Sequence, residues 1–122
     1  MIRAAGGGHV EIVRLLLSAG ADKDKADNDG CTPLIWAAIR GDVEMVQLFL
    51  SAGADKDKAD DEGSTSLIEA AYRGHVETVR LLLSAGADKD KANFIGWTPL
   101  SYAAIGDHQE IVQLLQTAGP QP

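Results

Sequence analysis

The chain has 122 residues, a formal net charge of −7, one cysteine and 45% hydrophobic residues. This length predicts one domain with a packed core. The acidic balance disfavours nucleic acid and membrane as partners, because both bind clustered Lys and Arg. A single cysteine forms no internal disulfide, which favours a reducing, cytoplasmic location, and we find no apolar stretch long enough to span a membrane.

The sequence repeats itself every 33 residues. Gly30, Gly63 and Gly96 have this spacing, and the segment SAGADKDKA occurs identically at 18–26, 51–59 and 84–92. Such a period is typical of a stacked array of one supersecondary unit. We predict a single all-α solenoid domain over 1–122, with a partial repeat at 1–28 followed by repeats at 29–61, 62–94 and 95–122.

The first unit is incomplete, because Met1 aligns with Leu34 of the second unit. Its turn and helix start are missing, so we expect fraying over 1–9. Terminal units of an array need polar outer faces, and this one leaves apolar residues without cover: Ile2, Val10, Ile12 and Val13. The chain looks like a piece of a longer array or an engineered one. We expect a monomer, with weak end-to-end self-association as an alternative.

The second unit defines the pattern that the later units repeat. Thr32 followed by Pro33 predicts the start of a short helix, because a hydroxyl suits the N-cap and proline suits the first helical position. Gly41 is expected to end that helix, and a second apolar-faced helix is predicted over about 42–51. Neither helix is long enough to be stable alone, so stacking of the units must create the core.

Several motifs, together with the 33-residue spacing, carry a resemblance to a known family: Gly30-Cys31-Thr32-Pro33-Leu34, Ala37-Ala38, Gly74-His75-Val76-Glu77, Val79-Arg80-Leu81-Leu82-Leu83 and Gly86-Ala87-Asp88. With them the chain resembles the ankyrin-repeat family over essentially its whole length. The resemblance implies antiparallel helix pairs, protruding fingers and a concave surface formed by the fingers and the first helices. It also implies protein binding without catalysis.

The chain departs from that family at two sets of positions. The usual His after Thr-Pro-Leu is replaced by Ile35, Ile68 and Ser101, which puts the inter-repeat hydrogen bonds at those points in doubt. Charged DKDK runs stand where the family often has apolar residues and Asn. We therefore expect the fingers to be more solvated than is usual.

Catalytic and metal sites are disfavoured by the repeat geometry. One register position, just before each second helix, holds His9, Asp42, His75 and His108. Neighbouring helices pack about 8–10 Å apart, whereas zinc needs nitrogens about 2 Å from the ion. We predict no catalytic residue, no cofactor and no metal site. A remote alternative is weak cation binding by the acidic fingers, most of all by Asp55, Asp57, Asp60, Asp61 and Glu62.

Positions that differ between repeats are free to carry binding specificity. Phe94, Ile95 and Trp97 surround Gly96 at a fingertip that other units fill with polar residues, and exposed aromatics are common interface anchors. The predicted partner-binding surface is Phe94, Ile95, Trp97, Tyr72, Arg73, Tyr102, Ile105, Trp36, Ile39 and Arg40. Alternatively, Phe94 or Trp97 folds back over the last unit. We predict a non-enzymatic protein-binding module; the alternative is a designed or truncated scaffold without a physiological partner.

Overall fold

The computed structural model describes residues 1–118, and over that range it consists of helices joined by turns and loops, without strands. The predicted all-α fold is confirmed. The helices are α1 (Ile2–Gly6), α2 (Val10–Ser18), α3 (Pro33–Arg40), α4 (Val43–Ser51), α5 (Ser66–Arg73), α6 (Val76–Ser84), α7 (Pro99–Ile105) and α8 (Gln109–Thr117).

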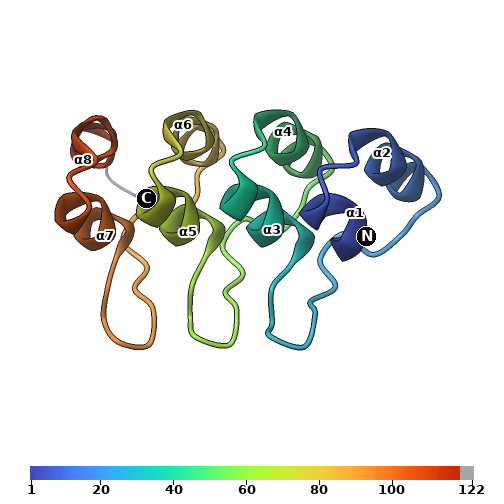
Figure 1. Ribbon diagram of the computed structural model, residues 1–122, viewed down its shortest axis with the longest axis horizontal. Helices are drawn as coiled ribbons and strands as arrows, with labels where there is room; N and C mark the ends of the chain where they lie inside the picture. Colours follow the sequence, from blue (N-terminus) through green and yellow to red (C-terminus); the bar gives the residue numbers. More distant parts are fainter. Residues whose placement is uncertain (119–122) are drawn as a thin grey trace.

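The helices are stacked as antiparallel pairs along one axis (Figure 1). The first helix of each pair, α1, α3, α5 or α7, lies in one row, and the second helix lies in a parallel row. The loops that precede α3, α5 and α7 project as fingers from the row of first helices. This arrangement leaves the fingers and one side of the first helices available to form a common surface.

The predicted helix starts are set by threonine caps. In each case the hydroxyl oxygen accepts the backbone N–H three residues on, at 3.2 Å: Thr32 from Ile35, Thr65 from Ile68 and Thr98 from Ser101. Such a bond satisfies one of the N–H groups that a helix start leaves without a partner. In α7, Ser101 also accepts from the Thr98 N–H, which completes a reciprocal capping box. Ser101 stands at one of the positions where the family usually has His.

The core runs through the whole stack. Ala37, Ala38, Ala70 and Ala71 have no exposed surface, and their small size lets neighbouring first helices approach closely. Larger side chains of the second helices fill the space behind them, among them Phe49, Met45, Val79, Leu82 and Ile111. The expectation that Val13 lacks cover is wrong, because this side chain is completely buried while its neighbour Ile12 stays 50% exposed.

The end of each first helix is followed by a left-handed residue, and the last repeat differs from the others. Gly41 and Gly74 have φ values of 69° and 76°, a conformation that glycine adopts without steric cost. At the equivalent place after α7 stands Asp107, with φ 58°. Aspartate tolerates this region better than most residues, so the turn survives a substitution that the spacing alone does not favour.

The DKDK runs connect one repeat to the next. The Asp24 carboxylate accepts the Asp55 N–H at 2.9 Å, and the Asp57 carboxylate accepts the Asp88 N–H at 2.8 Å. We expected these fingers to be solvated; Asp24 and Asp57 are instead half-buried structural acceptors.

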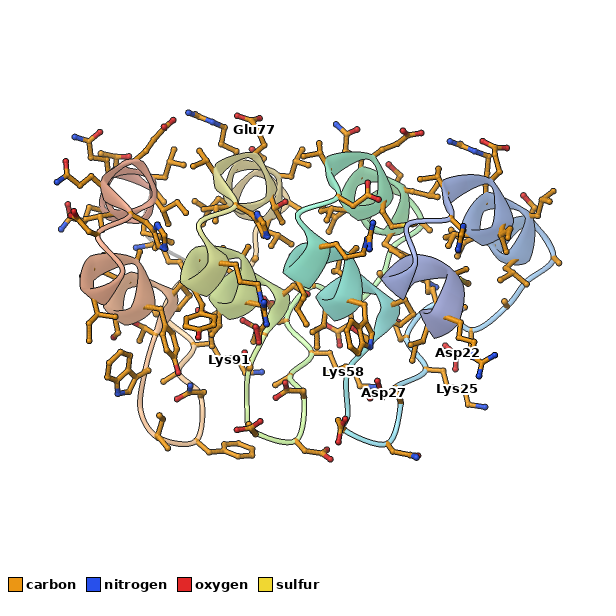
Figure 2. All side chains as sticks on the ribbon, in the orientation of Figure 1. Asp22, Lys25, Asp27, Lys58, Glu77 and Lys91 are labelled. Carbon is orange, nitrogen blue, oxygen red and sulfur yellow. The ribbon has the colours of Figure 1, made fainter. Side chains whose placement is uncertain are left out.

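The second lysine of each later run reaches back in the same way. Lys58 Nζ donates to the carbonyl of Asp24 at 3.2 Å, and Lys91 Nζ donates to the carbonyl of Asp57 at 2.9 Å. Both lysines lie where the loops leave the row of first helices (Figure 2). The identical segments therefore have a physical reason to be identical, because the middle one fits a copy on each side and each outer one fits the middle copy.

Candidate protein-binding surface

The third fingertip presents two large apolar side chains to solvent. Phe94 is 77% exposed and Ile95 is 74% exposed. The backbone beneath them is fixed: the Phe94 N–H donates to the Glu62 carbonyl at 3.0 Å, and the Asn93 side chain accepts the N–H groups of Ile95 and Trp97 at 3.2 and 3.0 Å. The fingertip is thus held against the finger before it rather than being a loose loop.

The two aromatic residues of this finger differ in their surroundings. The Phe94 ring lies beside Gly63, where an added Cβ would come within 2.8 Å of its Cδ1 atom, yet most of the ring remains exposed. Trp97 is half-buried, with its ring centroid 4.8 Å from that of Tyr102. Trp97 therefore folds back against the last unit, as the alternative prediction has it, whereas Phe94 does not.

The aromatic contacts continue from the third finger onto α5. Tyr102 on α7 meets Tyr72 on α5 edge to face, with centroids 5.3 Å apart. The guanidinium carbon of Arg73 lies 5.7 Å from the centroid of Tyr72. These predicted residues therefore form one continuous surface, which we call the aromatic row: Trp97, Tyr102, Tyr72 and Arg73. Ile105, at the end of α7, is 70% exposed.

Two of the predicted residues on α3 form hydrogen bonds within the chain. Trp36 Nε1 donates to the Asp27 carboxylate at 3.0 Å, which is the largest cause of the lowered pKa of Asp27. Arg40 donates to the carbonyl of Gly6 at 3.0 Å and so ties α3 to the end of α1. Ile39 is half-buried. These three residues lie on a first helix, as most of the aromatic row does. The hydrogen bonds of Trp36 and Arg40 stabilise the fold and do not require a binding partner to explain them.

A pocket opens between the second and third fingers, next to α5 and α7. Its volume is about 210 Å³, and its lining residues are Asp60, Glu62, Ser64, Ile68, Glu69, Tyr72, Asn93 and Tyr102. Tyr72 and Tyr102 were predicted from the sequence. Glu69 was not among the predicted binding residues. It stands in the same register as Trp36 and Tyr102, and a carboxylate where the other units have an aromatic ring is the signal that could have identified it.

Glu69 is an unusual residue for this position. Its side chain is only 17% exposed, and its Oε2 atom is buried without a hydrogen-bond donor among residues 1–118. Burial is the main reason why the pKa of Glu69 is raised; the charge of Arg73 opposes the shift, while that of Asp60 adds to it. The Arg73 Nε atom is 3.6 Å from Oε2, which is an ion pair rather than a hydrogen bond.

Cys31 lies close to the same acidic side chains. It is 8% exposed, and its thiol approaches the Asp60 Oδ2 atom at 3.9 Å. Burial, followed by the charges of Asp27 and Asp60, raises the pKa of Cys31 to about 12. The thiolate is the reactive form of cysteine, so this thiol has neither the access nor the ionisation that a nucleophile needs.

The histidines occupy the turn positions that the repeat predicts. His9, His75 and His108 are the N-cap residues of α2, α6 and α8, and Asp42 is the N-cap residue of α4. The His75 ring contacts the Ile39 carbonyl through Nε2 at 3.0 Å, which links the second and third repeats. Within residues 1–118, no three His, Cys, Asp or Glu side chains are grouped so that they could hold a metal ion.

Over residues 1–118 the structure is that of a helical-repeat protein with an open face formed by the fingers and the first helices. A family model described as ankyrin repeats (3 copies) matches residues 1–60 and again residues 41–122. These matches cover the chain, which belongs to the ankyrin-repeat family. No curated protein matches the sequence. In the part of the chain that the structure describes, no helix is long and apolar enough to cross a membrane.

Ankyrin repeats are in general modules for protein–protein interaction, and the family is typically non-enzymatic. The family therefore gives the broad class of function, while the partner and the contacting residues must be argued from this chain.

Proposed function

We propose that this chain is a cytoplasmic, non-enzymatic module that binds a protein partner through the concave face formed by its first helices and fingers. Phe94 and Ile95 are the anchors of this interaction, and the aromatic row extends the contact toward α5. A cytoplasmic location agrees with the lone, buried thiol of Cys31.

One observation carries the proposal: two large apolar side chains, each about three-quarters exposed, stand together on one fingertip whose backbone is fixed by hydrogen bonds. Contiguous exposed apolar groups are a typical feature of binding surfaces. A rigid backbone lowers the entropy that binding must overcome. The equivalent residues of the other fingers are Asn28 with Asp29, and Asp61 with Glu62, so the apolar tip is not a requirement of the fold.

Peptide-display selection against the intact chain, followed by affinity measurement, tests this proposal. The triple variant Phe94→Ala, Ile95→Ala, Trp97→Ala should weaken selected peptides by at least 30-fold, about 2 kcal/mol. The matched control is Ile12→Ala with Leu15→Ala, which removes two exposed apolar side chains from α2 and should leave affinity unchanged. Equal affinity in the finger variant would exclude the proposed anchors.

The alternative is a designed or truncated scaffold with no physiological partner, and the identical SAGADKDKA segments are compatible with a designed chain as well as with recent duplication. Affinity capture from a cell lysate with the intact chain and with the finger variant separates the two interpretations. A physiological module should retain a specific protein that the finger variant does not retain, whereas a scaffold should retain the same background with both.

A further inference from the structure

Two of the repeats join the base of the finger to the first helix by a side-chain hydrogen bond. Trp36 Nε1, in the second unit, donates at 3.0 Å to the carboxylate of Asp27, which lies in the loop just before that unit. The pair 66 residues later has the same arrangement: Asn93 Nδ2, in the loop just before the fourth unit, donates to the Tyr102 hydroxyl oxygen at 2.8 Å. One member of each pair supplies a donor and the other supplies an acceptor, so the contact is complete within the chain.

At the third unit, which we call the middle repeat, the equivalent pair is Asp60, in the loop just before the unit, and Glu69. Two carboxylates are acceptors only when ionised, so this pair cannot form the bond of its neighbours. Asp60 Oδ1 accepts the N–H groups of Glu62 and Ser64, both at 2.9 Å, while Oδ2 lies 3.9 Å from the Cys31 thiol. Glu69 Oε2 is buried without a hydrogen-bond donor among residues 1–118. Buried polar groups are normally hydrogen-bonded, so this pair has an acceptor to spare.

Aromatic rings stand beside these carboxylates. Tyr72 and Tyr102 line the same pocket of about 210 Å³. Ring faces attract organic cations, and carboxylates bind guanidinium and ammonium groups through charge-assisted hydrogen bonds. The chain itself provides an example at the rim, since Arg73 lies over Tyr72 and 3.6 Å from Glu69. Arg73 is not among the lining residues, so the interior remains available for a second cation.

We propose that this pocket receives an arginine or lysine side chain from the protein partner, with Glu69 and Asp60 as its acceptors and the two tyrosines as its walls. The inference rests on the proposed function and names the chemistry of the partner. The net charge of −7 and the carboxylates of the fingertips Asp61 and Glu62 favour the approach of a basic segment.

NMR titration of the isotope-labelled, intact chain tests the inference with three short blocked peptides. They are identical except for one central residue, which is arginine, lysine or citrulline. The arginine or the lysine peptide should give saturable chemical-shift changes at Glu69, Tyr72 and Tyr102. The peptide that binds more tightly identifies the preferred cation. Citrulline matches the shape of arginine without its charge, so its peptide should bind at least tenfold more weakly.

Two variants with the same change of charge separate the pocket from the general acidity of the surface. Glu69→Gln should weaken the cationic peptide at least tenfold. Glu77→Gln should leave it unchanged, because Glu77 lies on α6 at the side away from the fingers (Figure 2). Tyr72→Leu keeps an apolar wall without a ring and should weaken binding about fivefold. Equal losses in the two Glu variants, or equal binding of citrulline, would overturn the inference.

The finger variant distinguishes this inference from the proposed function. Display-selected peptides that depend on Phe94 but are indifferent to Glu69→Gln would overturn the cation pocket and leave the proposed function intact. Unchanged capture of the cationic peptide by the finger variant would support the pocket as a separate contact.

Discussion

The middle repeat and its two neighbours place different chemistry at the same pair of positions. The neighbours use these positions to tie a finger to a first helix, through Trp36 with Asp27 and through Asn93 with Tyr102. The middle repeat has a carboxylate at both, and one of them, Glu69, is buried with a raised pKa. A stacked array needs no single side-chain contact in every unit, because its stability is a sum over units and interfaces. One unit can therefore lack this hydrogen bond, which leaves its two carboxylates free for the binding role that we propose.

The hydrogen bond between Trp36 and Asp27, which we call the tie of the second unit, should have the largest effect on stability. Trp36→Ala removes a half-buried indole that lies near Gly6 and donates to Asp27. Full truncation of a buried tryptophan costs about 3–5 kcal/mol, so for this half-buried ring we expect a loss of about 2 kcal/mol in the free energy of unfolding, measured by urea denaturation. Leu15→Ala, at a side chain that is 69% exposed, should change it little. A similar loss in both variants would mean that Trp36 is not a tie.

The tie in the fourth unit should be weaker, because it is a single neutral hydrogen bond. Tyr102→Phe removes the hydroxyl that accepts from Asn93 at 2.8 Å and keeps the ring that contacts Trp97 and Tyr72. We expect a loss of about 1 kcal/mol in the free energy of unfolding. The double variant Asn93→Ala, Tyr102→Phe measures the coupling of the pair. Additive losses would show that the bond does not stabilise the fold.

Much of the fold could be predicted from the sequence, because the signals that define it are local and repeated. The threonine caps and Gly41 and Gly74 have the conformations that their spacing predicts. The matches to the family model cover the chain but do not fix where one unit ends, so the boundaries at 29, 62 and 95 stay predictions.

The binding surface was harder to predict, because it depends on contacts between repeats. Exposure of Phe94 and burial of Trp97 follow from which neighbour each ring meets, and a single unit does not reveal this. Glu69 was not among the predicted residues for a related reason. What sets it apart is the lack of a hydrogen-bond donor at Oε2 among residues 1–118, which draws notice only when its register is compared with Trp36 and Tyr102. The inter-repeat bonds of Asp24 and Asp57 were missed because a charged run in a loop resembles a solvated segment.

The smallest effect we expect is a difference in pH dependence between the equivalent pairs. The pKa of Glu69 is raised above its ordinary 4.5 in the folded chain, so the folded state binds this proton more tightly than the unfolded state. The free energy of unfolding should therefore fall as pH rises from about 4.5 through the raised pKa. The pKa of Asp27 is lowered below 3.8, so its contribution is present above 3.8 and is lost as pH falls through the folded value.

Glu69→Gln should remove the decline above pH 4.5, and Trp36→Phe should weaken the acid-side dependence of Asp27, whose exposure keeps that term small. Urea denaturation of the parent chain and both variants at a series of pH values measures the two slopes. Glu77→Gln, which removes an exposed carboxylate on α6, should follow the parent chain. If Glu69→Gln and Glu77→Gln have the same pH profile, Glu69 is solvated rather than buried without a hydrogen-bond donor, and the contrast between the middle repeat and its neighbours does not hold.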